Sequence, residues 1–301
     1  MRIIDRFNNF FCNTVKDRSI IYGQNITTGS RISGLTNKLE NLKNIEIFNT
    51  QNSEASLIGF GFGLMISKIH SVYFAKQLDF LLLGFDHIVN TLNSALLQNV
   101  QTSFSIITYI VDSGYEGPQS RFHSLFEISS MSKANCNYLI FPNDIKCNLK
   151  KIKKKGFNIF CLSQKYSKTS YNPKILYKNK DEDCFKYNSG SNYTLVAMGF
   201  AAYEVYRLIS VNKNFKNSDF FVISNPSFKE AKEIIKSANK TRKVYLFDDS
   251  RSESKRLDEL ENIIKHKNKK VIFKKFYRDE NVQSLYPNSD EYLLKLNAKS
   301  C

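Results

Sequence analysis

The sequence predicts an α/β protein with two doubly wound domains, and three observations lead to this fold class. Short apolar runs of strand length alternate along the chain with segments of helical periodicity. The run FSIITYIV at residues 104–111 is apolar and β-branched almost throughout, which is typical of a parallel strand buried on both faces. A polar stretch at residues 163–191 separates two such alternating blocks.

The first block begins with residues 1–45, which are predicted as helix, turn and helix, with the second helix at Ser33–Leu42. Ser53 occupies the N-cap position of the helix that follows the first strand. The apolar residues of Asp79–Gln98 recur at helical spacing and predict one long helix. Strands are predicted at Ile45–Phe48, Ser71–Phe74, Phe104–Val111, Tyr138–Phe141 and Phe157–Leu162, and further helices from Ser124 and over the basic run 146–155.

The second block begins at Asn192 and predicts a smaller α/β domain. Its strands are expected at Tyr193–Met198, Asp219–Ser224, Val244–Phe247 and Val271–Phe273, and its helices at Ala201–Val211, Ser227–Ala238 and Glu253–Lys265. We therefore expect a first domain at 1–165, a linker at 166–191 and a second domain at 192–301.

Composition and the N-terminal residues indicate a cytoplasmic location. No run of about 18 uncharged apolar residues occurs, so we expect no membrane-spanning helix. The N-terminal segment has charges on both sides of its apolar residues and no small-residue cleavage site, which argues against a secretory signal. The six cysteines are scattered without CxxC spacing, which favours reduced thiols over a metal site.

The chain carries a formal net charge of +16, which raises the question of nucleic-acid binding. The densest basic run, CNLKKIKKKG at residues 146–155, has no interleaved aromatic residues, and no helix-turn-helix, zinc or RNA-binding signature accompanies it. A solvated helix face explains this run better than a nucleic-acid groove. The positive field would still help to attract phosphorylated ligands or an acidic partner chain.

Glu54 is the residue on which the functional interpretation depends. It is the one acid at a strand–turn–helix junction inside an otherwise apolar segment. Ligands of open α/β sheets bind beyond the carboxyl ends of the strands. The loops at 50–54, 74–80 and 112–120 are expected there, so Glu54 and Phe80 should lie near one another. The alternative is an exposed acid that is placed near a helix start for dipole reasons alone.

Four stretches, in order, resemble motifs of the transketolase-like thiamine diphosphate enzymes. They are most similar to the beta subunit of the decarboxylating 2-oxo acid dehydrogenases, such as pyruvate dehydrogenase. TQNSEASLIGFGFGLM at 50–65 resembles TPxxEAxxxGxAxGxA, and DFLLLGFDHIVN at 79–90 resembles DFxxxAFDQIxN. DSGYEGPQSRFHSLFEI at 112–128 matches the position of a glycine-rich loop ending in HSQS. GSNYTLVAMGFAAYEV at 190–205 resembles GxDvTlvaxGxxvxxa, which opens the C-terminal domain of that family.

The resemblance implies a pyrimidine-binding domain followed by a transketolase C-terminal-like domain. It assigns Glu54 as the catalytic and cofactor-binding acid that hydrogen-bonds a ring nitrogen of the aminopyrimidine. Proton exchange there prepares the cofactor's amino group to take the proton of the thiazolium carbon. The resemblance places Phe80 where an aromatic ring stacks on the aminopyrimidine, although a core phenylalanine is the plain alternative.

The chain departs from the family on the substrate side. The resembled beta subunits carry a histidine in the glycine-rich loop, but the matching stretch Gly117–Ser120 has none. Tyr115 and Gln119 are candidates to supply hydrogen bonds instead, and His123 lies three residues further on. His87 replaces a glutamine of the family pattern, and we expect it to be a hydrogen-bonded structural residue. These departures leave the substrate open.

A GDG motif, which in the family holds magnesium and the cofactor's diphosphate, is absent from the sequence. The resemblance therefore implies an alpha-type partner chain that brings the magnesium ligands, in an alpha2beta2 assembly with a beta–beta contact and a site at the chain interface. The expected reaction acts on a carbon–carbon bond beside the carbonyl of a small molecule, with 2-oxo acid decarboxylation and transfer of the acyl or aldehyde unit as the first choice. Ketol transfer or carboligation, and a non-catalytic structural subunit, are the alternatives.

Overall fold

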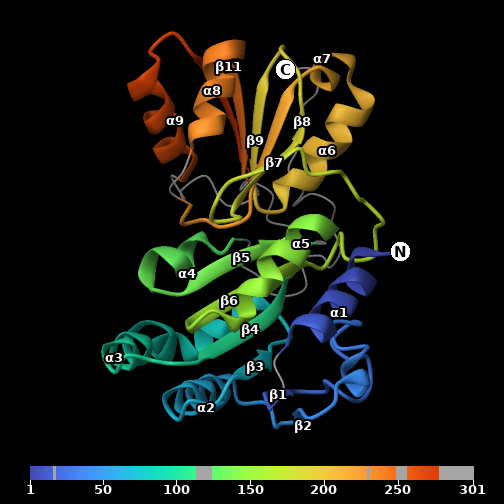
Figure 1. Ribbon diagram of the computed structural model, residues 1–301, viewed down its shortest axis with the longest axis vertical. Helices are drawn as coiled ribbons and strands as arrows, with labels where there is room; N and C mark the ends of the chain where they lie inside the picture. The colour runs from blue at the N-terminus through green and yellow to red at the C-terminus, as the bar shows by residue number, and fades with distance from the viewer. Residues whose placement is uncertain (16–17, 113–123, 229–230, 249–255, 278–301) are drawn as a thin grey trace, which may run out of the picture. The chain divides into compact units, whose positions relative to one another are not determined.

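The chain forms two compact units (Figure 1). In this computed structural model the described residues are 1–15, 18–112, 124–228, 231–248 and 256–277. Unit 1 comprises Met1–Val111 and Ile128–Asn172, and unit 2 comprises Asp112–Glu127 and Pro173–Cys301. Each unit holds one six-stranded sheet with helices packed on it, so the α/β fold class is confirmed.

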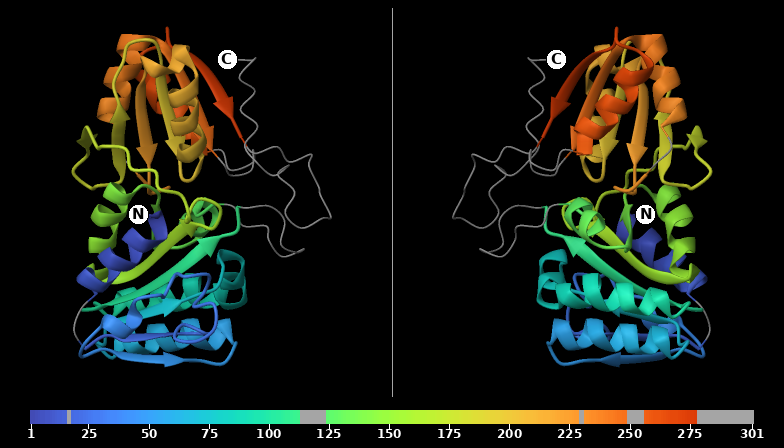
Figure 2. Two further views of the ribbon diagram at one scale, coloured as in Figure 1. Left: turned by 90° about the vertical axis from the view of Figure 1, so that its right-hand side faces the viewer. Right: turned by 90° about the vertical axis from the view of Figure 1, so that its left-hand side faces the viewer.

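The sheet of unit 1 is parallel throughout, with the strand order β2-β1-β3-β4-β6-β5 (Figure 2). Its central strands β4 and β6 are buried along their whole length. Such strands need cover on both faces, and helix α1 packs with α5 while α2 packs with η2, η3 and α3. The strands are β1 (Ile20–Gly23), β2 (Glu46–Asn49), β3 (Ser71–Phe74), β4 (Ser103–Ile110), β5 (Asn135–Leu139) and β6 (Gly156–Ser163). The helical segments are α1 (Ile3–Thr14), η1 (Leu39–Asn41), α2 (Glu54–Ile66), η2 (Leu78–Gly84), η3 (His87–Thr91), α3 (Leu92–Leu97), α4 (Phe126–Met131), α5 (Pro142–Leu149) and η4 (Lys150–Lys153).

The segment between α1 and β2 differs from the prediction in two ways. Residues 20–23 form β1, a strand that the sequence analysis missed and that pairs with both β2 and β3. The helix predicted at Ser33–Leu42 is wrong, because turns fill this segment before the short η1. Arg31, Ile32 and Ser33 all have φ near +50°, a left-handed conformation that no right-handed helix can contain.

The single helix predicted at Asp79–Gln98 is also wrong. The segment forms η2, η3 and α3, and its axis bends by 77° between Gly84 and His87. A Cβ atom on Gly84 would lie 2.5 Å from Ile58 Cδ1, so close packing against α2 takes place where the axis turns. Within the described parts of the chain, no single helix is long and apolar enough to cross a membrane. The bent pair meets that test only when its two arms are counted together.

The sheet of unit 2 is mixed, with the order β12-β11-β9-β10-β8-β7. Strands β7 (Tyr177–Lys178) and β8 (Cys184–Asn188) lie inside the stretch predicted as a linker, and β8 pairs antiparallel with β10. The predicted strands and helices of this block correspond to β9 (Thr194–Met198), β10 (Asp219–Ile223), β11 (Lys243–Asp248) and β12 (Ile272–Phe276), and to α6 (Ala201–Val211), α8 (Lys232–Thr241) and α9 (Arg256–Lys267), with the short α7 (Lys213–Lys216) in addition.

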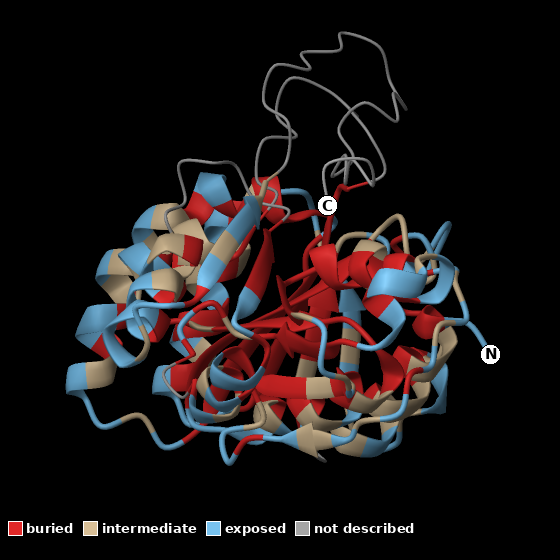
Figure 3. Ribbon diagram, turned by 90° about the horizontal axis from the view of Figure 1, so that it is seen from above, coloured by how far each residue is buried: buried red, intermediate tan, exposed pale blue. Residues whose placement is uncertain are grey.

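Buried residues gather on the strands of both sheets, and exposed residues on the outer helix faces (Figure 3). In unit 1 the ring of Phe104 on β4 lies 5.2 Å from that of Phe62 on α2 and 5.1 Å from that of Phe157 on β6. This aromatic contact fixes the face of α2 that meets the sheet. The start of α2 is thereby held at the carboxyl edge of the strands.

Candidate functional site

The acid at the start of α2 is buried at the carboxyl edge of the unit 1 sheet. Glu54 is the first residue of the helix, and only 6% of its surface is exposed. Ser53 is in the N-cap position as predicted, but its hydroxyl donates to Ser56 Oγ at 2.9 Å and makes no capping hydrogen bond. The alternative of a solvent-exposed acid at a helix start is therefore wrong.

Glu54 lies beside a pair of stacked tyrosines. Tyr22 on β1 and Tyr73 on β3 are register partners, and their ring centroids are 5.3 Å apart. Burial raises the pKa of the Tyr73 phenol, and the nearby Glu54 carboxylate raises it further. The Tyr22 hydroxyl donates to the carbonyl oxygen of Leu57 at 2.8 Å. The Tyr22 hydroxyl thus anchors the first turn of α2, and Tyr73 brings a second polar side chain close to Glu54.

Two oxygen-bearing side chains at this edge have no partner among the described residues. The Glu54 carboxylate receives no hydrogen bond and forms no ion pair within the described chain. The buried hydroxyl of Thr50, in the loop after β2, likewise has no described partner. Buried polar groups are normally hydrogen-bonded, so a partner outside the described residues, such as water or a ligand, is expected for the Thr50 hydroxyl and is open to Glu54.

Phe80 lies on η2, the helical segment that follows β3 in the chain. It is partly buried, and its ring stacks on no other aromatic ring among the described residues. Because β1 alone separates β2 from β3, the connections that lead to Glu54 and Phe80 leave the same part of the sheet edge. Helix α2 also packs against η2 through Ile58 and Gly84. The elements that carry the two predicted cofactor-binding residues are therefore packed together.

The other predicted site residues lie outside the described residues. These are Tyr115, Gln119 and His123, which follow β4 in the sequence. Their assignment to the substrate side stays a prediction.

The histidine of the second motif has a structural role in unit 1. Nδ1 of His87 lies 2.9 Å from the hydroxyl of Thr91, one helical turn along. A Cβ atom on Gly59 would lie 3.0 Å from His87 Nε2, so the ring packs directly on the α2 backbone. His87 is the hydrogen-bonded structural residue that was expected.

Sequence reasoning placed the loop 50–54 at this edge but did not single out the Thr50 hydroxyl, and it did not identify Tyr73 as part of the edge. Tyr73 occupies one of four consecutive buried strand positions, where a tyrosine looks like any core aromatic. Thr50 is an ordinary loop residue next to a strand. Its position directly after β2, four residues before Glu54, was the one available signal.

The described residues contain no group of three or more His, Cys, Asp or Glu side chains that could hold a metal ion. Every cysteine among them is a free thiol. Burial raises the pKa of the Cys136 and Cys161 thiols in the core, which disfavours the thiolate form that binds metals.

The sequence matches no protein-family model and no curated protein. The fold, in contrast, is similar to that of a solved split-gene transketolase, described as an inactive beta4 tetramer. The TM-score is 0.68, the sequence identity is 10%, and the similarity covers 93% of this chain and 90% of that one. At this identity the similarity shows the fold alone. The two α/β units of this chain therefore share the fold of that split-gene transketolase chain.

Proposed function

We propose that this chain is the pyrimidine-binding subunit of a two-chain, thiamine diphosphate-dependent enzyme that acts on a carbon–carbon bond beside a carbonyl. One observation carries the proposal: a buried acid stands at the carboxyl edge of a parallel sheet, with no partner among the described residues. In the resembled family the same motif position holds the acid that binds the cofactor. We assign residues 1–165 to the pyrimidine-binding domain, 166–191 to the linker and 192–301 to the C-terminal domain.

The residues at this edge fit the aromatic half of the cofactor. A carboxyl group can hydrogen-bond a ring nitrogen, and Glu54 has no hydrogen-bond partner among the described residues that would compete. Phe80 offers a ring on which no described aromatic residue stacks, and Thr50 offers a buried hydroxyl. Tyr73 places a buried phenol close to Glu54 on the side of the sheet. When bound, thiamine diphosphate supplies an acidic carbon that adds to a carbonyl and accepts the electron pair of the broken bond.

The diphosphate half of the site is assigned to a partner. The sequence has no GDG motif, and the described residues offer no metal-binding cluster. We propose an alpha-type subunit that brings magnesium and the diphosphate contacts, in an alpha2beta2 assembly located in the cytoplasm. The similar split-gene transketolase is described as an inactive beta4 tetramer, which supports the expectation that this chain alone is inactive.

Decarboxylation of a 2-oxo acid, with transfer of the acyl or aldehyde unit, is our first candidate reaction. It rests on four motifs that resemble the 2-oxo acid dehydrogenase beta subunits in the same order. Ketol transfer is the second candidate, because the stretch Gly117–Ser120 lacks the loop histidine of those subunits. Turnover of 2-oxo acids and of ketose phosphates by the assembled pair distinguishes the two.

The test compares the chain alone with the chain co-purified with an alpha-type subunit that carries a GDG motif. We expect cofactor binding, measured by calorimetry, and turnover only in the pair. Glu54→Gln should lower turnover by about 10²–10³-fold, the usual contribution of a positioned acid or base. Glu40→Gln is the matched control, because Glu40 is an exposed acid of the same unit that pairs with Arg31. It should change turnover by less than about twofold.

Two results would overturn the proposal. If Glu54→Gln turned over at the wild-type rate, Glu54 would not be the cofactor acid. If the wild-type pair bound no thiamine diphosphate in the presence of magnesium, the chain would be a non-catalytic member of the fold.

A further inference from the structure

The amino-terminal edge of the unit 1 sheet carries a row of cations. Because all six strands are parallel, the connections that enter them lie along one edge, opposite the edge that holds Glu54. Five of the six strands have a basic residue within three positions before their first residue. In spatial order these are Lys43 before β2, Arg18 before β1, Lys68 before β3, Lys153, Lys154 and Lys155 before β6, and Lys133 before β5. We call these seven residues the basic edge.

The basic edge is exposed, and no described acid neutralises it. All seven residues are exposed, and none forms an ion pair with another described residue. The described connections into the strands contain no aspartate or glutamate, and Glu46 is the first residue of β2. Lys155 donates to Gln101 Oε1 at 2.6 Å, which leaves its charge uncompensated. This pattern differs from Arg31 of the same unit, which is paired with an acid.

The spacing of the strands couples the charges within two groups of the basic edge. No basic residue precedes β4, so two strand spacings, about 9.6 Å, separate Lys68 from the lysines before β6. Strands lie about 4.8 Å apart, so the outer connections of a six-stranded sheet are about 24 Å from one another. The Debye length at physiological salt is about 8 Å, which exceeds the spacing of adjacent strands. An extended peptide rises about 3.3 Å per residue, so about seven residues would cover the row.

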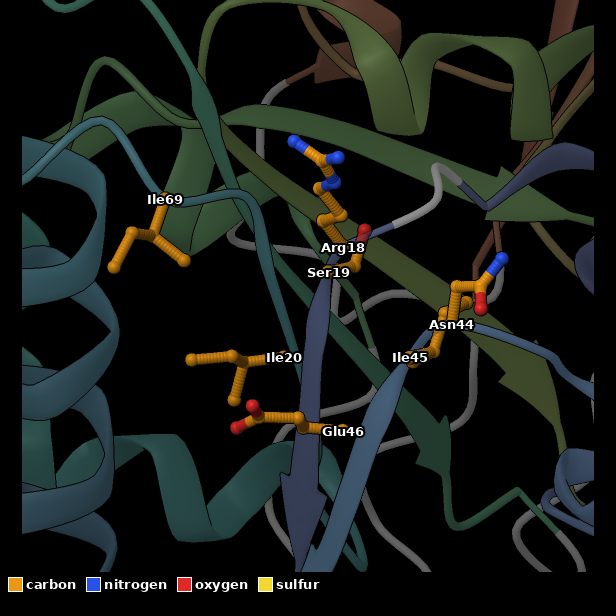
Figure 4. Close-up of a pocket in the computed structure, with 7 residues that line it drawn as sticks. All are labelled: Arg18, Ser19, Ile20, Asn44, Ile45, Glu46 and Ile69. Carbon is orange, nitrogen blue, oxygen red and sulfur yellow. The ribbon is translucent and has the colours of Figure 1, made fainter.

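A pocket opens at the β1–β2 end of the same edge (Figure 4). Its volume is about 840 Å³, and Ile20, Ile45 and Ile69 supply its apolar lining. Ile69 is 36% exposed, so an aliphatic side chain can reach it from solvent. Arg18 and Glu46 extend in different directions from this pocket, and Glu46 lies on the side of Ile20 (Figure 4). The pocket thus places three isoleucines beside Arg18 at one end of the basic edge.

We propose that the basic edge and this pocket form a docking surface for an extended acidic segment of a partner protein, with one aliphatic side chain in the pocket. The carboxylates of that segment pair with the lysines, and the isoleucines bury its aliphatic side chain. The described connections contain no aromatic residue and only one arginine, whereas nucleic-acid sites rely on aromatic stacking and arginine. A second copy of this chain carries the same net charge of +16 and is repelled.

The test uses the full chain and a fluorescein-labelled peptide of about eight residues, made of glutamates around a central leucine, the length that spans the row. Binding is measured by fluorescence anisotropy at physiological salt. The triple variant Lys68→Glu/Lys133→Glu/Lys153→Glu should weaken binding by about tenfold or more. The matched control is Lys180→Glu/Lys213→Glu/Lys216→Glu, which makes the same charge change at exposed lysines of unit 2. It should weaken binding by no more than about threefold.

Three further variants test the two parts of the surface. Changing the same three basic-edge lysines to glutamine should reduce peptide affinity less than changing them to glutamate. The thermal unfolding of this variant should match that of the wild type. Ile69→Ser should weaken binding of the leucine-centred peptide by about fivefold and leave binding of a serine-centred peptide unaffected. Glu46→Gln should tighten binding of either peptide, because it removes the acid at the end of the row.

Equal losses in the two triple variants would show that net charge alone drives binding, and would overturn the proposal. Tighter binding of a DNA duplex than of the peptide, lost in the basic-edge variant, would overturn it in favour of nucleic acid. The outcome is independent of cofactor binding at Glu54, because the two edges of the sheet are tested with different ligands.

Discussion

Asp219 shows how a single buried charge organises unit 2. It is the first residue of β10 and is 1% exposed. Its carboxylate lies 2.8 Å from Lys186 Nζ and 2.7 Å from Lys240 Nζ, and it accepts hydrogen bonds from Ser237 Oγ at 2.6 Å and the Gly190 N–H at 3.0 Å. Burial by itself would raise the pKa of Asp219, but these four donors outweigh burial and hold it at about 2. The carboxylate thus joins β8, α8 and the connection into β9.

Asp219→Asn should destabilise the protein by about 2–3 kcal/mol at neutral pH, since the folded state stabilises the ionised form. The pKa of Asp219 is lowered on folding, so its contribution is present above an unfolded-state pKa of about 4 and is lost as the pH falls toward about 2. Urea unfolding at pH 7 and at pH 3 measures both effects. The variant should also lose less stability than the wild type between these two pH values.

Asp86→Asn is the control for this experiment, because Asp86 is an exposed aspartate in unit 1. We expect a change within about 0.5 kcal/mol. A similar loss in Asp86→Asn and Asp219→Asn would contradict the special role of the buried carboxylate.

At the scale of elements, α2 shows that two glycines of one helix can differ in how much space is left for a side chain. A Cβ atom on Gly61 would lie 2.3 Å from the ring of Phe104 and 2.6 Å from the hydroxyl of Tyr22. A Cβ atom on Gly63, two residues on, would meet nothing within 4 Å. The glycine at 61 permits close contact between helix and sheet, whereas the glycine at 63 faces open space.

Gly61→Ala should destabilise the protein by about 1–3 kcal/mol, because the Phe104 ring is packed between neighbouring rings and cannot move freely. Gly63→Ala should stabilise the isolated chain by up to about 1 kcal/mol through helix propensity. Urea unfolding of the two variants side by side measures the difference. Stabilisation by both substitutions would mean that α2 does not pack on the sheet as described.

At the scale of the whole molecule, buried phenols and thiols make the stability of the fold sensitive to alkaline pH. Burial is the largest cause of the raised pKa of Tyr22, Tyr73 and Tyr109, and of the thiols of Cys136 and Cys161. A group whose pKa is raised on folding stabilises fully below its unfolded-state pKa. This contribution is lost as the pH rises through the folded-state pKa.

We therefore expect the free energy of unfolding to fall steadily above about pH 8.5, where free thiols ionise, and faster above about pH 10, where free phenols ionise. Urea midpoints between pH 7 and pH 11 measure this loss. Tyr73→Phe should reduce the slope, because it removes one of the buried phenols. Tyr171→Phe makes the same change at a partly exposed position and is the matched control. A flat profile in the wild type would contradict the expectation.

Much of the element pattern could be predicted because it depends on local periodicity. The continuous apolar run of β4, the strand β3 and the helix α6 all occur where the sequence places them. The four-residue β1 was missed because its length gives too little periodicity, although it is the strand that pairs with both β2 and β3. In the site, the position of Glu54 at a helix start was predictable, but its burial beside Tyr73 was not.

The sequence by itself determined the α/β class, the order of most strands and helices along the chain, and the acid at the head of α2. These follow from residue spacing and from resemblance to known motifs, which are properties of neighbouring residues. Only the tertiary structure decided the strand order, the bend after Gly84, the burial of Glu54 and the gathering of the basic edge. Each of these depends on hydrogen bonds and packing between segments that are distant in the chain, which no local pattern specifies.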